Sequence, residues 1–170
     1  MERQSKLRYL RRVNDALQRG LNFFGIIFFA IFISVVFLQV ISRNYLRISM
    51  LWIQEVALFC FIWSVFLGGA IAVRQRQHYI VEIFPARMVR LNQLLDLFAD
   101  LALFGMVYIL LPIGLQFTHL GINRLSRVLL VPQAYFFAAF PVAGACILLF
   151  GIENLIDDIR RLRAGPPAST

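Results

Sequence analysis

The residues with the chemistry for catalysis or metal binding are few, and they lie far apart in the sequence. Asp96 and Asp100 stand one helical turn apart, as a carboxylate pair for acid/base work would, but no nucleophile accompanies them and both fit the solvated start of a helix. His78 and His119 are expected in loops on opposite sides of a membrane, where they cannot share a haem or a metal ion. The pattern therefore predicts no catalytic site, no cofactor and no metal, so the chain is not expected to be an enzyme.

The apolar stretches of the chain carry no charged side chains at their centres. Cys60 and Cys146 fall inside such stretches without a CxxC spacing, which favours a packing role for both. The middle of each stretch holds no Asp, Glu, Lys, Arg or His. A transporter or channel that works alone usually carries such groups at mid-membrane, because an ion or charged solute needs a replacement for water. The sequence accordingly favours an accessory role.

Polar and small residues at the ends of the first two apolar stretches are more informative. Arg43 follows the first stretch, Trp52 opens the second, and Glu55 lies one turn further on. A carboxylate inside a span is costly without a partner, so we expect an Arg43–Glu55 ion pair, with Glu55 reaching back to water as the alternative. Gly68 and Gly69 predict a small face on which another helix packs closely, from this chain or from another subunit.

Membrane-spanning helices must position these residues. Of the 170 residues, 60% are apolar and 15% are charged, a composition that does not suit a water-soluble domain of this size. The apolar residues gather in four runs, each near the roughly 20 residues that cross a hydrocarbon core of about 30 Å. The fold is therefore predicted to be all-α and integral to the membrane, with a domain over 21–155 and transmembrane helices over 21–41, 52–73, 94–117 and 134–155.

Two features are expected in the second half of this domain. Pro112 and Pro141 should kink or loosen the third and fourth spans, because proline removes a backbone hydrogen bond. Between these spans the segment 128–131 is apolar enough either to return towards the membrane or to meet a partner.

Basic residues predict the orientation of the chain. Thirteen of the 17 Lys and Arg side chains lie in the two termini and the middle loop, and four lie in the other two loops, which predicts that both termini are cytoplasmic. Residues 1–20 show a basic amphipathic stripe that predicts an interfacial helix on membrane lipids, with a basic tail that only sets topology as the alternative. Residues 156–170 form a cytoplasmic tail with a disordered end. The net charge of +8 lies beside spans and not on a soluble domain, so nucleic acid is not an expected partner.

The stretch 39–82 resembles the small membrane subunit, called DctQ-type, of the tripartite ATP-independent periplasmic (TRAP) transporters. In that family a Ser-Arg pair ends the first helix, a Trp-x-x-Glu opens the second, a glycine-bearing segment closes the second, and a His stands four residues before an acid. The matching residues here are Ser42 and Arg43, Trp52 and Glu55, Gly68 and Gly69, and His78 and Glu82.

The resemblance implies a three-part machine in the bacterial inner membrane. A periplasmic substrate-binding protein would capture an organic acid, a large DctM-type permease subunit would carry it with sodium, and the small subunit would pack beside the large one as a scaffold. The resulting candidates for the subunit interface are Arg43, Trp52, Glu55, Gly68, Gly69, His78 and Glu82. A self-assembling small multi-helix pump or channel is the alternative, and the charge-free span centres speak against it.

Overall fold

The computed structural model describes the backbone of residues 2–46, 50–75 and 89–164, and the side chains of residues 12–45, 50–75 and 98–156. His78 and Glu82 lie outside the described residues. The described chain forms, in order, the helices α1 (Glu2–Ile41), α2 (Leu51–Arg74), α3 (Val89–Ile122), the single turn α4 (Ala134–Phe137) and α5 (Ala139–Ala164). A π-helical turn, Ser42–Leu46, extends α1. The all-α prediction is confirmed.

Four helical segments of the described chain are long and apolar enough to cross a membrane. They cover Arg12–Tyr45, Leu51–Arg74, Phe98–Ile122 and Ala134–Ile156. Each overlaps one predicted span, so the prediction of four transmembrane helices is confirmed, with helix ends that differ by several residues. The ends differ because hydropathy marks only the part of a helix that is apolar, whereas the hydrogen-bonded helix continues into polar sequence.

The first helix is longer than a membrane is thick. Its 40 residues, at about 1.5 Å per residue, extend about 60 Å, against about 30 Å for a hydrocarbon core. The segment 1–20 is helical from Glu2 and continues into the span without a break, so it forms a prolongation of α1 and not a separate element. Its position along a lipid surface stays a prediction.

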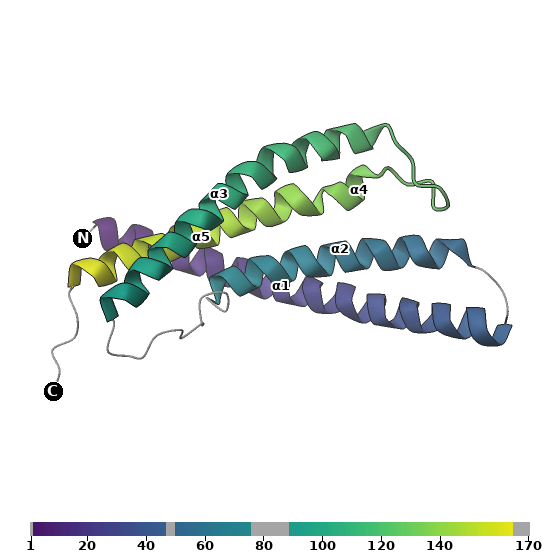
Figure 1. The fold of residues 1–170 in the computed structure, drawn as a ribbon, viewed down its shortest axis with the longest axis horizontal. Helices are drawn as coiled ribbons and strands as arrows, with labels where there is room; N and C mark the ends of the chain where they lie inside the picture. The colour runs from purple at the N-terminus through teal and green to yellow at the C-terminus, as the bar shows by residue number, and fades with distance from the viewer. Residues whose placement is uncertain (1, 47–49, 76–88, 165–170) are drawn as a thin grey trace.

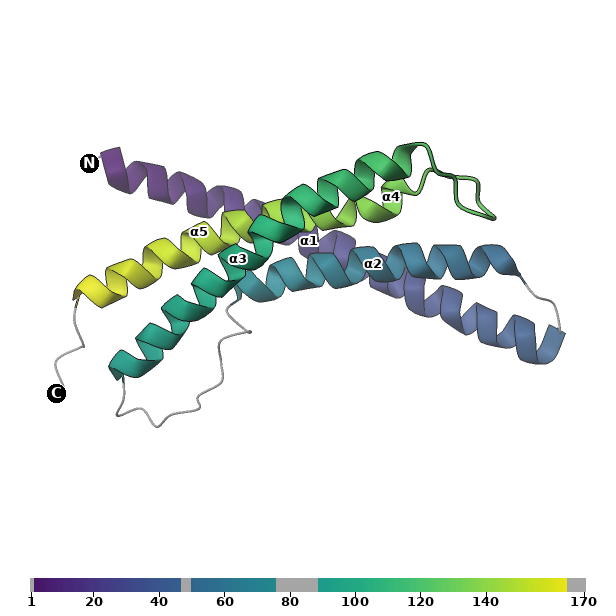
Figure 2. The same cartoon turned by 45° about the horizontal axis from the view of Figure 1, so that its top comes forward.

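The helices form two antiparallel pairs that meet along one line of contact (Figures 1 and 2). In one pair α1 packs on α2, and in the other α3 packs on α4 and α5. The pairs meet chiefly where α2 packs on α5, so these two helices form the centre of the described bundle. The start of α1 and the end of α5 lie at the same end of the bundle, opposite the loop that joins α3 to α4 (Figure 1). We call these the terminal end and the loop end.

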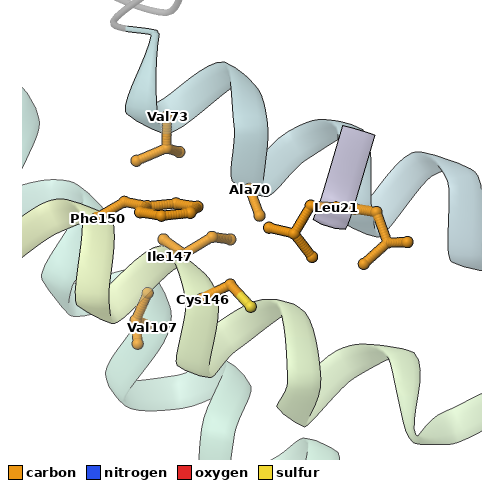
Figure 3. Packing of buried hydrophobic residues seen from close by; sticks show 8 residues of the cluster. Leu21, Ala70, Val73, Val107, Cys146, Ile147 and Phe150 are labelled. Atoms are coloured by element: carbon orange, nitrogen blue, oxygen red, sulfur yellow. The ribbon is translucent and has the colours of Figure 1, made fainter. Parts of the chain in front are cut away.

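A compact apolar core lies at the junction of the two pairs (Figure 3). Four helices contribute its buried side chains, which are Leu21, Leu67, Ala70, Val73, Val107, Cys146, Ile147 and Phe150. Most are small or of medium size, which lets the four backbones approach closely. Cys60 and Cys146 are both free and buried, which agrees with the packing role expected for them.

Glycines set the separation of α3 from α4 and α5. A Cβ atom at Gly121 would stand 2.7 Å from the backbone nitrogen of Ala134, and one at Gly114 would stand 2.9 Å from Cβ of Phe140. Both distances are shorter than a real Cβ atom tolerates, so these helices can touch only where the side chain is absent. Gly114 and Gly121 therefore serve close packing.

Proline acts differently in the two helices of this pair. Pro112 lies inside α3, which continues through it as one α-helix. The break expected in the fourth span is present, because α4 ends at Phe137, four residues before Pro141. Pro141 has no backbone N–H to donate to the carbonyl of Phe137, the residue at which α4 ends.

Candidate subunit interface

The carboxylate of Glu55 is bound by the loop between α3 and α4. Glu55 lies one turn into α2, and its Oε1 and Oε2 atoms accept hydrogen bonds from the backbone N–H groups of Val128 and Leu129, at 3.0 and 2.9 Å. The predicted Arg43–Glu55 pair is wrong. Arg43 is exposed beyond the end of α1, and no ion pair joins it to Glu55. Two converging N–H donors use both carboxylate oxygens, so the cation is not needed.

The loop that binds Glu55 is a small hairpin. Ser126 N donates to Val131 O at 2.8 Å, Gln133 N donates to Arg124 O at 2.8 Å, and an isolated antiparallel bridge joins Leu125 to Pro132. We call residues 124–133 the α3–α4 hairpin, and its contact with Glu55 the loop clamp. These bonds give the hairpin a fixed shape and hold it against α2.

Aromatic side chains extend the contact between the two helix pairs further along α2, beyond the loop clamp. Nε1 of Trp63 on α2 donates a hydrogen bond to the carbonyl of Tyr135 on α4 at 3.1 Å. The rings of Phe59 and Phe136 meet edge to face with centroids 5.3 Å apart. Such aromatic pairs and the indole bond resist separation of the two helix pairs at the loop end.

A polar cluster joins α1, α2 and α5 at the terminal end. Arg74, the last residue of α2, forms an ion pair with Asp15 of α1 and lies 4.0 Å from the carboxylate of Glu153 on α5. The Arg74 guanidinium also lies over the ring of Phe150, 5.2 Å from its centroid. Only 12% of the Arg74 side chain is exposed, so its interactions are screened less than those of a surface arginine.

Two buried asparagines complete this cluster. Asn14, 1% exposed, donates from Nδ2 to Oε2 of Glu153 at 2.5 Å. Asn154 donates from Nδ2 to the carbonyl of Val73 at 3.0 Å, which satisfies an orphan acceptor near the end of α2. We call the five polar residues the terminal clamp: Asn14, Asp15, Arg74, Glu153 and Asn154. It fixes the crossing of three helices.

The remaining candidate residues occupy two kinds of position. Trp52 is 42% exposed in the first turn of α2, and its place at the membrane interface stays a prediction. A Cβ atom at Gly68 or at Gly69 would meet nothing within 4 Å, so their small face does not serve packing within the described chain. Asp100 corrects another expectation, because it is buried at 1% exposure and is not part of a solvated helix start. The side chain of Asp96 lies outside the described residues.

Gly68 belongs to an exposed stripe along α2. Leu58, Phe61 and Val65 precede it at helical spacings of three and four, and they are 52%, 47% and 50% exposed. Three large apolar residues followed by an open glycine make a surface that is shaped for another helix. We call Leu58, Phe61, Val65 and Gly68 the α2 stripe.

The terminal clamp is the feature that the sequence reasoning missed. In the sequence analysis Arg74 counted only as a basic residue that sets topology. Asn14 and Glu153 are 139 positions apart, so nothing in the sequence connects them. A signal was present in Asn14, a polar residue that interrupts the apolar side of the N-terminal stripe. Glu153 gave another, because it is an acid directly after the apolar part of the last span.

Four long apolar helices, joined by a polar clamp at each end of the described bundle, define a small multi-pass membrane protein. The sequence model for the DctQ component of the tripartite ATP-independent periplasmic transporters matches residues 32–161. The chain belongs to this family, which consists of transporter components and not of enzymes.

Two curated relatives come from strains of Haemophilus influenzae. One is named "Sialic acid TRAP transporter permease protein SiaT", and it is 24% identical over 132 residues, which cover 77% of this chain and 21% of the relative. The other is named "Putative TRAP transporter small permease protein", and it is 24% identical over 107 residues, which cover 62% of this chain and 66% of the relative. The chain thus spans about one fifth of the first relative and just under two thirds of the second.

Proposed function

We propose that this chain is a scaffold subunit that packs beside the large permease subunit of a TRAP transporter, for sodium-coupled uptake of an organic acid captured by a periplasmic binding protein. Family membership supports the transport role and the existence of a large membrane partner. The first relative carries a segment similar to this chain within a permease polypeptide several times longer, which supports a partner that also lies in the membrane.

The observation that carries the scaffold role is where the charged groups lie. Glu55 lies one turn into the span Leu51–Arg74, which Arg74 ends. Asp100 lies in the first turn of the span Phe98–Ile122, and Glu153 lies in the last turn of the span Ala134–Ile156. Glu55, Arg74 and Glu153 are already bound within the chain by the two clamps. Groups used in this way hold helices together and are not free to coordinate a passing ion or carboxylate.

Reconstitution tests this function directly. The chain alone in vesicles is expected to move no organic acid, whereas the chain with the large permease and the binding protein should give uptake that depends on a sodium gradient. Both reconstitutions use vesicles of the same lipid composition and the same internal volume, so that their uptake rates can be compared. Uptake by the chain alone, abolished by a substitution within it, would support the self-assembling pump and refute the scaffold role.

The face that meets the large subunit is proposed to be the α2 stripe. It is apolar, it contains an open glycine, and it lies in the segment that carries the family resemblance. Gly68→Leu is expected to weaken co-purification with the large subunit, because the added side chain fills the space that a partner helix would occupy.

Gly105 offers a matched control for this variant. It lies on α3, is exposed, and has nothing within 4 Å of an added Cβ atom, as at Gly68. Gly105→Leu should therefore change helix content and span hydrophobicity in the same way while leaving co-purification intact. If Gly105→Leu disrupts the complex and Gly68→Leu does not, the large subunit docks on α3 and the assignment to α2 is wrong.

A further inference from the structure

The tip of the α3–α4 hairpin presents a run of apolar side chains away from the protein. Val128, Leu129 and Val131 are 39%, 38% and 37% exposed, and Leu130 is 66% exposed. Leu130 also has a φ of 54°, in the left-handed region that a leucine adopts only at a cost. An exposed leucine in a strained conformation gains little from contacts within the chain, so its favourable contacts are expected outside it.

The hairpin lies alongside the transmembrane helices and does not extend beyond them. Its N–H groups bind Glu55, which is one turn deeper along α2 than Trp52. In Figures 1 and 2 the hairpin lies beside the first turns of α2, and the end of α1 extends further along the long axis. The tip is therefore level with the apolar turns of α2, where the surroundings change from lipid headgroup to hydrocarbon.

Non-helical backbone at such a depth requires that its polar groups have partners. Here Glu55 accepts from two of the tip N–H groups, Ser126 N binds Val131 O, and Gln133 N binds Arg124 O. The loop clamp thus removes donors that would otherwise need water. A carboxylate inside an apolar span and a hairpin at the same depth each satisfy what the other lacks.

Charge at the base of the hairpin matches lipid headgroups. Arg124 and Arg127 are exposed, and both lie on the arm of the hairpin that leads into the apolar tip. Long arginine side chains reach from an apolar surface to phosphate groups, with which guanidinium forms paired hydrogen bonds. A soluble acidic partner would also suit the arginines, but it would leave four apolar side chains at the depth of the bilayer to be covered in another way.

We propose that the α3–α4 hairpin is a membrane-inserted element: residues 128–131 lie in the lipid leaflet on the loop side, Arg124 and Arg127 contact phospholipid phosphates, and Glu55 makes this insertion possible by binding the hairpin backbone. The hairpin therefore recognises a phospholipid surface. The inference concerns this chain and the bilayer, so it is independent of the scaffold role.

Spin-label accessibility distinguishes lipid, water and protein surroundings of the tip. The full chain, with Cys60 and Cys146 replaced by alanine, carries a single nitroxide at Leu130→Cys in phosphatidylethanolamine and phosphatidylglycerol vesicles. Ile109→Cys, an exposed site within the span of α3, gives the lipid reference, and Asn44→Cys, exposed beyond the end of α1, gives the water reference. Collision rates with oxygen, which partitions into lipid, and with a water-soluble nickel chelate are then compared.

The label at Leu130 is expected to collide preferentially with oxygen, as the label at Ile109 does. Adding Glu55→Ala should raise its collision rate with the nickel chelate several-fold, because the freed N–H groups draw the hairpin towards water, whereas Glu55→Gln, which keeps one acceptor oxygen, should raise it less. Nickel-chelate access in the parent protein equal to that of Asn44 would overturn the proposal. Low collision rates with both reagents would also overturn it, since they would show that protein covers the tip.

Discussion

The close contact between α3 and α4 gives the sharpest stability prediction. Gly121→Ala places a methyl group 2.7 Å from N and 3.0 Å from Cα of Ala134, and 2.9 Å from Cδ2 of Phe137. Two of these three atoms belong to the backbone, so rotation of a side chain cannot relieve the overlap. The substitution must push α4 away from α3.

The size of the effect follows from two opposing terms. Overpacking of this kind costs about 1–3 kcal/mol, and a clash with backbone belongs near the top of that range. Replacing glycine by alanine within a helix returns roughly 0.5–1 kcal/mol. Gly121→Ala should therefore lower the free energy of unfolding by about 2 kcal/mol, or the Tm by about 4–8 °C for a chain of this length.

Gly105→Ala measures the gain from replacing glycine by alanine in a helix without any overlap, because nothing lies within 4 Å of the added Cβ atom. It should stabilise α3 slightly or leave it unchanged. Helicity followed by far-UV circular dichroism during thermal and SDS unfolding, in one detergent for both variants, measures the difference. If Gly121→Ala were as stable as Gly105→Ala, the glycines could not be what sets the distance between these helices.

Three further predictions concern the clamps and the orientation. Arg74→Ala should lower the free energy of unfolding by about 1–3 kcal/mol, because it leaves Glu153 without its cation. Arg12→Ala, at an exposed site, should change this free energy by less than about 0.5 kcal/mol in the same SDS titration. Equal losses would refute the terminal clamp. Glu55→Ala should accelerate hydrogen exchange of the two hairpin amides that it binds, seen by mass spectrometry, and unchanged exchange would show that the loop clamp does not protect them. Reporter fusions should place Asn123 outside the cytoplasm and the C-terminus inside, and a cytoplasmic Asn123 would refute the four-span topology.

Sequence reasoning succeeded where the signal is local. The spans follow from long apolar runs, whose helical state in lipid is enforced by backbone hydrogen bonding. The need of Glu55 for a partner also follows locally, because an acid inside an apolar run is costly. Its partner could not be found in this way. The donors are backbone N–H groups 73 and 74 positions away, and every non-proline residue carries such a group, so no residue type marks them.

The terminal clamp and the close helix contacts could not be predicted from the sequence, for a related reason. Asn14 and Glu153 come from opposite ends of the chain, and only the crossing of α1 with α5 brings them together. Gly114 carries a local signal, but sequence alone relates it to a kink beside Pro112 as readily as to packing. The structure distinguishes the two roles, since α3 continues through Pro112 while Gly114 touches α5.

The order of the two clamps along the chain has a consequence for biogenesis. The ion pair between Asp15 and Arg74 lies wholly within the first helix pair, so both of its members are present before the second pair is synthesised. In contrast, the partners of Glu55 and Asn14 lie later in the chain, at Val128 and Glu153. Neither clamp is complete until the second pair has emerged from the ribosome. A nascent chain that stops short of α5 therefore lacks the Glu153 carboxylate that Asn14 and Arg74 contact in the complete fold.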